Sequence, residues 1–260
     1  MQQHWLTNLP IHGVMKTEPL LRGVANDVYK ITATSGVYVL KHFRFDHPYG
    51  LDRDQEVAVQ QILFNHGLAP EVLHYDAVQG LMLQAFIETP DLAHDSKSMG
   101  TKIQRIGEIC AHIHRLPVDV PVWSLRSRVQ RYCDNLAQYE PDRAKQFQKR
   151  LQRQRKLLDS FGNNPVFCHN DLAFHHVFLS QPPQVIDWEY SGLGERYFDL
   201  ANCIQVNQLE HAEQRAFINA YEGASGERVD VQHLQNWLEL SQTISQLWYE
   251  LHHHLQHHHL

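Results

Sequence analysis

Two aspartates in the second half of the chain are the residues best suited to do chemistry. Asp171 ends the apolar run VFCHND, and Asp187 ends the run PPQVID, 16 residues later. A strand, a polar loop and a second strand, each strand closed by an aspartate, would place both carboxylates at the mouth of one small hairpin. Phosphoryl transfer uses such a pair, because one carboxylate orients the proton of an attacking hydroxyl while the other binds Mg²⁺ beside the phosphates.

A hairpin near the N-terminus carries a cation that could support them. Residues 20–34 and 37–43 are rich in β-branched and aromatic residues and are joined by a turn that contains Gly36, which predicts a β-hairpin. Side chains alternate along a strand, so Lys41 shares a face with Val39. The lysine is either an ordinary edge charge or a cation that points into a cleft.

The next segment, residues 52–66, has the pattern of a helix. Asp52 and Gln55 are spaced like a capping box, and Glu56 falls on the same stripe as the apolar residues. A carboxylate on a buried face needs a partner, because an unpaired buried charge is costly. Lys41 is the natural candidate.

The remaining elements predict an α+β fold of two lobes. A strand at 81–88 is followed by a break at Pro90, where we place the boundary between an N-lobe, 1–90, and a C-lobe, 91–260. The N-lobe is expected to be a small antiparallel sheet and the C-lobe to be mainly helical. Helices are expected at 98–116, as one or two helices within 126–160, and from 205 to the end.

Composition narrows the class of protein. The 260 residues carry a net charge of −6, which does not favour nucleic acid as a partner. The first residues do not resemble a signal peptide, and no run of 18 apolar residues predicts a membrane span. Four separated cysteines without a C-x-x-C motif are expected to be reduced thiols of a cytoplasmic protein. The histidine-rich last nine residues are expected to be a polar helix end.

Three motifs in the second half resemble a known superfamily. They are His169-Asn170-Asp171-Leu172, Ile186-Asp187-Trp188-Glu189-Tyr190 and Phe198-Asp199-Leu200-Ala201. Together they resemble the aminoglycoside phosphotransferase and choline kinase superfamily, which is similar in fold to protein kinases. The resemblance implies that Asp171 is the catalytic base, that His169 structures its loop and that Asp187 binds the metal. It also implies that Asp199 braces the catalytic loop.

The N-terminal half matches the same superfamily in the same order. The run from Arg22 to Tyr29, with Gly23 and Asn26, resembles the loop over the phosphates. The resemblance implies that Lys41 contacts the α- and β-phosphates and pairs with Glu56. It also implies that residues 84–88, including Gln84 and Phe86, form the hinge that holds adenine through the backbone. ATP and Mg²⁺ are therefore the expected cofactors, with GTP left open.

Each of these residues alone has an ordinary structural account, for example Asp171 as a turn residue or His169 as a buried structural histidine. The prediction rests on the ordered set. Its members are Gly23, Lys41, Glu56, His169, Asp171, Asp187 and Asp199.

One position departs from the family's pattern. A metal-binding Asn is expected after Asp171 and four intervening residues, where this chain has His176. Imidazole favours softer cations than Mg²⁺, which an amide oxygen suits better. Three explanations stay open: Asp187 with Glu189 or waters suffices, His176 binds a metal such as Mn²⁺, or catalysis is impaired.

The run Asp187 to Tyr190 resembles choline, ethanolamine and thiamine kinases in particular. We expect Glu189, Tyr190 and Trp248 to contact the substrate, since aromatic faces attract organic cations. A cationic alcohol is thus the expected substrate. An aminoglycoside or amino-sugar kinase and a nucleotide-binding pseudokinase are the alternatives. A protein kinase is disfavoured, because only 12 positions separate Asp187 from Asp199. The partners expected are the alcohol and ATP, without nucleic acid or membrane; the oligomeric state is open.

Overall fold

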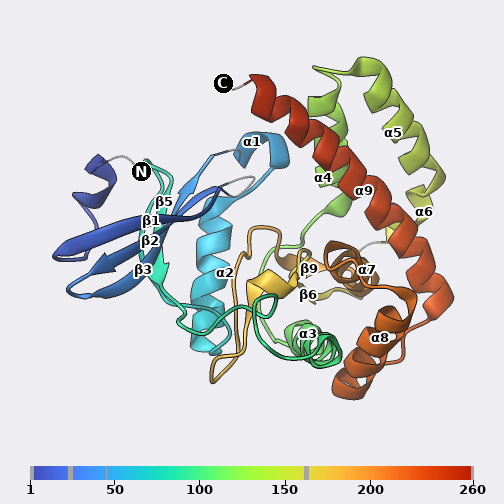
Figure 1. The fold of residues 1–260 in the computed structure, drawn as a ribbon. Helices are drawn as coiled ribbons and strands as arrows, with labels where there is room; N and C mark the ends of the chain where they lie inside the picture. The colour runs from blue at the N-terminus through green and yellow to red at the C-terminus, as the bar shows by residue number, and fades with distance from the viewer. Residues whose placement is uncertain (1–2, 23–25, 45, 161–163, 259–260) are drawn as a thin grey trace. The chain divides into compact units, whose positions relative to one another are not determined.

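The computed structural model describes residues 3–22, 26–44, 46–160 and 164–258 (Figure 1). Their contacts divide the chain into two compact units. The first unit consists of Met1–Pro90 and Phe178–Glu189, and the second of Asp91–Val177 and Tyr190–Leu260. The first unit is therefore not the single stretch 1–90 that the sequence predicts, because a later segment folds onto it.

An antiparallel sheet of five strands forms the centre of the first unit. Its order is β1-β2-β3-β5-β4. The strands are β1 (Val14–Arg22), β2 (Asn26–Ala33), β3 (Gly36–Phe43), β4 (Val72–Asp76) and β5 (Leu81–Ala85). The predicted hairpin is present as β2 and β3, paired from Ala33 opposite Gly36 to Asn26 opposite Phe43. The predicted run 20–34 includes the end of β1 as well as β2, and the predicted strand 81–88 ends at Ala85.

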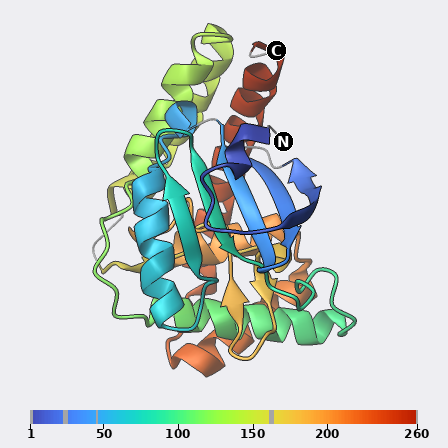
Figure 2. The same cartoon turned by 90° about the vertical axis from the view of Figure 1, so that its left-hand side faces the viewer.

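The two faces of this sheet are covered by different segments. On one face, Leu81 and Leu83 pack with Trp5, which belongs to the short 3₁₀ helix η1 (Gln3–Leu6). On the other face, Met82 packs with Phe43 and with Val57 of helix α2. This alternation follows from the period of two along a strand. The helices of this unit are α1 (Asp46–Tyr49) and α2 (Arg53–Asn65), and Figure 2 shows α2 lying along the sheet.

The face that α2 covers also carries Lys41, which lies opposite Met82 in the β3–β5 pairing. Asp52 caps α2 as predicted, because its carboxylate accepts a hydrogen bond from the Gln55 main-chain N–H at 3.0 Å. The helix thereby begins one turn before Glu56 and brings that carboxylate to the buried face of the sheet.

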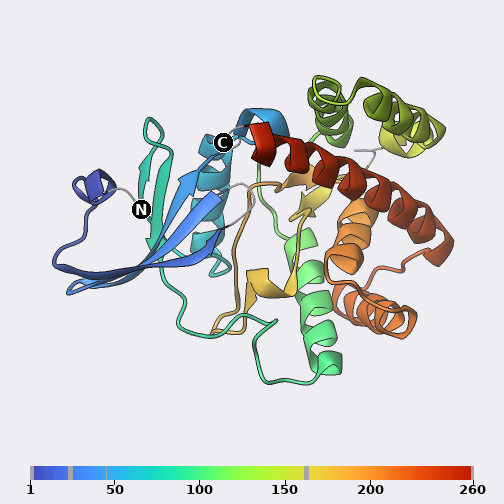
Figure 3. The same cartoon turned by 45° about the horizontal axis from the view of Figure 1, so that its top comes forward.

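The second unit is mainly helical, as predicted (Figures 1 and 3). Its helices are α3 (Met99–His114), α4 (Leu125–Leu136), α5 (Pro141–Arg153), α6 (Arg155–Ser160), α7 (Arg196–Val206), α8 (His211–Ser225) and α9 (Val231–His258). Helix α3 packs against α8, and α9 packs against α7 and α4. The segment predicted to hold one or two helices, 126–160, contains three. None of the described helices, including the 28-residue α9, is apolar enough along its length to cross a bilayer.

The predicted hairpin between the two aspartate-bearing runs is wrong. Strand β6 (Val166–Cys168) pairs with β9 (Gly192–Gly194), and β8 (Gln184–Val185) forms a separate two-stranded sheet with β7 (Val177–Phe178). A 3₁₀ turn, η2 (Phe174–His176), lies between β6 and β7. Strands of two or three residues carry too little alternation to define their partners, so the sequence pattern does not distinguish these pairings.

Candidate active site

A buried cluster of charges joins β3, α2 and residues 187–189 of the first unit. The ammonium of Lys41 lies 2.7 Å from Asp187 Oδ1 and 3.3 Å from Glu56 Oε1. Lys41 is 4% exposed and Glu56 is 1% exposed, so both charges depend on each other for solvation. The structure thus brings together three residues that the sequence predicts to act at one site.

Arg53, which the sequence analysis missed, is the second cation of this cluster. One guanidinium nitrogen donates to Glu56 Oε2 at 2.6 Å and to Glu189 Oε2 at 2.8 Å. The other donates to Asn26 Oδ1 at 2.9 Å, and Asn26 Nδ2 donates to Glu189 Oε2 at 3.1 Å. Position 53 is one helical turn before Glu56, and this spacing was the available signal.

Three carboxylates and two cations lie close together, and all of them are shielded from water except Asp187, whose side chain is 26% exposed. Burial opposes the charge of Lys41, but Asp187, Glu56 and Glu189 outweigh it and raise the pKa of the lysine. Burial, and then repulsion by Asp187, raises the pKa of Glu189 to about 7, against the attraction of Arg53. When Glu189 is ionised, the cluster has one negative charge in excess, and its carboxylate oxygens are hard ligands of the kind that Mg²⁺ prefers. Asp187 and Glu189 therefore fit this ion.

A strained turn sets the direction of Asp187. Its φ angle is 70°, in the left-handed region that aspartate adopts more readily than most residues. The adjacent Trp188 is 1% exposed, and its indole N–H donates to the carbonyl of Val185 at 2.9 Å. This anchor fixes the turn, so the carboxylate of Asp187 is directed at Lys41.

Gln84 and Phe86, two further predicted nucleotide contacts of the first unit, make other contacts. The side chain of Gln84 is buried and accepts a hydrogen bond from Gln60 at 2.9 Å. The main-chain N–H of Phe86 donates to Val37 at 3.3 Å, and the Lys30 ammonium lies 4.2 Å from the centre of its ring. That N–H is thus already bound within the sheet. Gly23 lies outside the described residues.

In the second unit, side chains hold the backbone of the predicted catalytic loop. Asp199 of α7 accepts hydrogen bonds from the main-chain N–H of His169 at 3.1 Å and of Asn170 at 2.7 Å. Asn202, one turn further along α7, donates to the Asn170 carbonyl at 2.5 Å. The loop therefore depends on α7 for its shape, and Asn170 adopts a φ of 63° within it.

The C-cap of the same helix holds the second half of the loop. Asn207 Oδ1 accepts from the Phe174 N–H at 2.7 Å, and its Nδ2 donates to the Leu172 carbonyl at 2.9 Å. Asp171 itself is half-buried, whereas Asn170 and Leu172 are buried. These contacts fix the backbone on both sides of the half-buried Asp171.

Two histidines contact the peptide groups of Asp171 itself. The Asp171 N–H donates to His169 Nδ1 at 3.2 Å, and His176 Nδ1 lies 2.8 Å from the Asp171 carbonyl oxygen. Their rings are stacked, with centroids 5.8 Å apart and planes inclined by 20°. The structure therefore places His169 and His176, predicted for the catalytic loop and the metal respectively, next to the predicted base.

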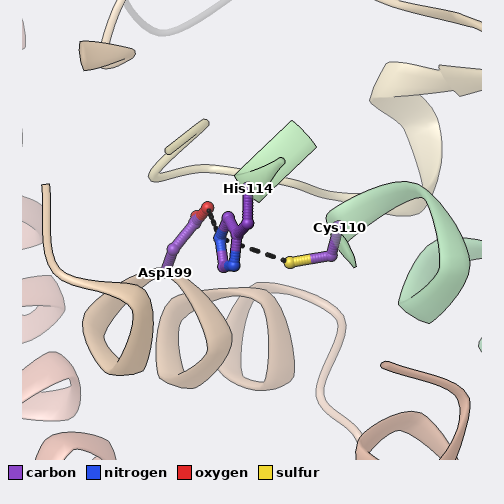
Figure 4. Close-up of side chains that lie close together, drawn as sticks. All are labelled: Cys110, His114 and Asp199. Carbon is purple, nitrogen blue, oxygen red and sulfur yellow. Dashed lines mark hydrogen bonds and ion pairs between the residues drawn. The ribbon is translucent and has the colours of Figure 1, made fainter. Parts of the chain in front are cut away.

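A buried group of Cys110, His114 and Asp199 lies behind the loop (Figure 4). His114 Nε2 donates to Asp199 at 2.9 Å, and the Tyr221 hydroxyl oxygen lies 2.9 Å from His114 Nδ1. Burial would raise the pKa of Asp199, but the hydrogen bond from His114 and the Asn170 N–H lower it below its ordinary range. Burial raises the pKa of the Cys110 thiol. A protonated thiol and a carboxylate already bound by N–H donors do not suit a metal site. Cys110, His114 and Asp199 instead form a brace that supports the catalytic loop.

Aromatic residues predicted to contact the substrate also meet in the second unit. The Trp248 indole N–H donates to the Tyr190 hydroxyl at 3.2 Å, and Trp248 stacks on His252 with centroids 5.2 Å apart. Arg128, which the sequence analysis missed, lies 5.0 Å from the centre of the Tyr190 ring and 4.8 Å from that of Trp123. An arginine thus occupies an aromatic face that the sequence assigns to a substrate cation.

The chain is similar in sequence to an amino-alcohol kinase. The chain is 26% identical to ethanolamine kinase 1 of Mus musculus over 170 residues, which cover 58% of the chain and 46% of that relative. The chain therefore spans less than half of that relative's length.

Two solved structures show the fold. One is the choline kinase LicA from Streptococcus pneumoniae, with a TM-score of 0.75 at 24% identity, covering 94% of this chain and 87% of that one. The other is a spectinomycin phosphotransferase in complex with ADP and spectinomycin, with a TM-score of 0.65 at 15% identity and coverage of 96% and 87%. The model of the phosphotransferase enzyme family matches residues 16–240, and the chain belongs to that family.

Proposed function

We propose that this chain is an ATP-dependent phosphotransferase that phosphorylates the hydroxyl of a small cationic alcohol of the choline or ethanolamine type. The observation that carries the proposal is the buried cluster of Lys41, Glu56 and Asp187, because a lysine held by two carboxylates suits the binding of nucleotide phosphates. Family membership and the named amino-alcohol kinases among the relatives support the same reaction.

Each residue has one task in this proposal. Lys41 binds the phosphates of ATP, and Glu56 keeps the lysine extended towards them. Asp187, together with Glu189, would hold Mg²⁺, which supplies positive charge at the phosphates when it is bound. Asp171 orients the substrate hydroxyl and accepts its proton. Asp199 binds the main-chain N–H groups of His169 and Asn170 and thereby holds the loop that carries Asp171.

The substrate class rests on the aromatic side chains of Tyr190 and Trp248. Their faces attract organic cations, and the hydrogen bond between them fixes the orientation of both rings. Thiamine has a cationic ring and a primary alcohol and belongs in the same test, as do amino sugars.

The test is an assay of ADP release with ATP and either Mg²⁺ or Mn²⁺, run against choline, ethanolamine, thiamine, an amino sugar and spectinomycin. Choline or ethanolamine should stimulate ADP release above the rate without acceptor. Asp171→Asn should lower kcat by at least about 10²-fold, the usual contribution of a general base, while nucleotide binding is retained. If spectinomycin alone stimulates ADP release, the substrate is not a small cationic alcohol and the antibiotic-kinase alternative applies. Nucleotide binding without turnover of any acceptor would favour a pseudokinase.

A further inference from the structure

We propose that His176 is a positioning residue that acts with His169 as a clamp on the peptide groups of Asp171. This inference rests on the proposed function, because it assumes that Asp171 is the residue that meets the substrate hydroxyl. It gives His176 a task that involves its Nδ1 atom and no metal ion.

The geometry of the clamp covers both polar groups of the Asp171 backbone. His169 Nδ1 accepts the N–H of Asp171, and His176 Nδ1 lies 2.8 Å from its carbonyl oxygen. His169 is fully buried and His176 is 5% exposed, so water does not readily replace either contact. Asp199 and Asn202 hold residues 169 and 170, so the backbone that carries the Asp171 carboxylate is fixed.

The two contacts require opposite states of the two rings. A main-chain carbonyl accepts hydrogen bonds and cannot donate them, so Nδ1 of His176 must carry a hydrogen. A main-chain N–H can only donate, so Nδ1 of His169 must be the bare nitrogen. His176 therefore carries a hydrogen on Nδ1, and His169, whose Nδ1 is bare, is the Nε2–H tautomer.

The local fold explains why His176, and not its neighbour, makes the contact. The turn η2 is closed by a hydrogen bond from the His176 N–H to the Ala173 carbonyl at 3.0 Å, which folds the chain back towards Asp171. The side chain of His175 is exposed, whereas that of His176 is buried against the His169 ring. His175 is therefore a matched control one residue away.

Three variants test the role through kinetics. His176→Phe keeps an aromatic ring for stacking but has no hydrogen-bond donor. It should lower kcat by roughly 10- to 100-fold, because a misplaced catalytic group costs about 10²-fold per ångström, while KM for ATP changes less than about twofold. His176→Asn restores a side-chain N–H and should retain most of the activity. His175→Phe should behave like the wild type.

Two kinetic outcomes would overturn the proposal. The first is wild-type kcat in His176→Phe. The second is an equal loss of kcat in His176→Phe and His176→Asn, since a side-chain N–H at this position would then not support activity.

A spectroscopic measurement tests the clamp even if a variant does not fold. Long-range ¹H–¹⁵N correlation spectra of the wild-type protein report which ring nitrogen carries the hydrogen. The clamp predicts Nδ1–H at His176 and Nε2–H at His169, with both rings assigned by through-bond correlation to the backbone of the wild-type protein. An Nε2–H tautomer at His176 would refute the clamp. If no acceptor stimulates ADP release while these tautomers are found, the proposed function fails and the geometry of the clamp stands.

Discussion

Arg53 balances two carboxylates of the charge cluster in the first unit. It contacts Glu56, Glu189 and Asn26, and its guanidinium carbon lies 4.2 Å from the centre of the Phe43 ring. Removing one partner of a buried ion pair leaves the other charge uncompensated, at a cost of about 3–5 kcal/mol. We expect Arg53→Met to lower the free energy of unfolding by an amount in this range.

The decrease in the free energy of unfolding caused by Arg53→Met should grow with pH. Burial and Asp187 raise the pKa of Glu189 to about 7, so the stability contributed by its protonated form is complete below the ordinary pKa of a glutamate and is lost as pH rises through the raised value. Without Arg53 the pKa of Glu189 rises further, so the variant continues to lose stability at pH values where the wild type no longer does. Urea unfolding at about pH 6 and about pH 8 measures the difference. The exposed Arg44, which pairs with Asp27 at 3.2 Å, is the control, since Arg44→Met should cost no more than about 1 kcal/mol. An equal loss for Arg53→Met at both pH values would contradict the account.

Arg128 bears on the choice of substrate. Its guanidinium covers the ring faces of Tyr190 and Trp123, where a substrate ammonium would compete with it. A cation–π contact is worth about 0.5–1 kcal/mol at a partly exposed site. We expect Arg128→Gln to raise kcat/KM for choline by roughly two- to fivefold and to leave KM for ATP unchanged. Arg131→Gln, at an exposed position of the same helix, is the control. A lower kcat/KM for choline in Arg128→Gln would show that the arginine supports the substrate site.

At the scale of elements, the packing of α3 against α8 positions the brace behind the catalytic loop. A Cβ atom on Gly107 would lie 2.8 Å from Ala220 Cβ and 2.9 Å from the Phe217 carbonyl oxygen. The carbonyl belongs to the main chain of α8 and cannot rotate away, so the helices would have to separate. We expect Gly107→Ala to cost about 1–3 kcal/mol, the usual range for overpacking, measured by denaturant unfolding.

Gly100 lies on the same helix, and a methyl group added there would have no neighbouring atom within 4 Å among the described residues, which makes it the matched control. Gly100→Ala should leave stability unchanged or raise it by up to about 1 kcal/mol, because alanine is the better helix former. Stability unchanged in Gly107→Ala would mean that the two helices are not held at this distance.

The sequence predicted the elements that have both a recognisable end, such as a cap or a glycine turn, and a regular apolar face. Helices α2 and α3 have side-chain caps at Asp52 and Ser98 and regular apolar stripes, and the β2–β3 hairpin has a glycine turn between two long strands. The short strands β6 and β8 have no such marks. Their pairing is decided by what surrounds them, and the predicted hairpin was therefore wrong.

The same limit applies to the candidate site. Helical spacing places Glu56 on the buried face and allows Lys41 as its partner, so this pair was predictable. The contacts of Arg53 with Glu189 and of Arg128 with Tyr190 join residues 136 and 62 positions apart. No local pattern specifies contacts over such separations, and both arginines were missed.

At the scale of the whole molecule, the chain leaves the first unit after Pro90 and returns to it for Phe178–Glu189. Asp187 arrives with this returning segment and meets Lys41 there. The predicted metal ligand and the predicted phosphate-binding lysine therefore belong to one compact unit, whereas the predicted base, Asp171, belongs to the other.

Because Asp187 and Asp171 belong to different units, we expect their loss to affect stabilisation by ATP and Mg²⁺ differently. A ligand at 100 times its Kd stabilises a protein by about 2.7 kcal/mol, which corresponds to a rise in Tm of roughly 5–10 °C for a chain of this size. We expect ATP with Mg²⁺ to produce such a rise in the wild type and in Asp171→Asn. In Asp187→Asn the part of the rise that requires Mg²⁺ should shrink or disappear, because the negative charge that would hold the ion is lost. Differential scanning calorimetry with and without Mg²⁺ measures both effects, and AMP, which has no β- and γ-phosphates, is the control. A Mg²⁺-dependent rise that survives in Asp187→Asn and is lost in Asp171→Asn would reverse the assignment of the two aspartates.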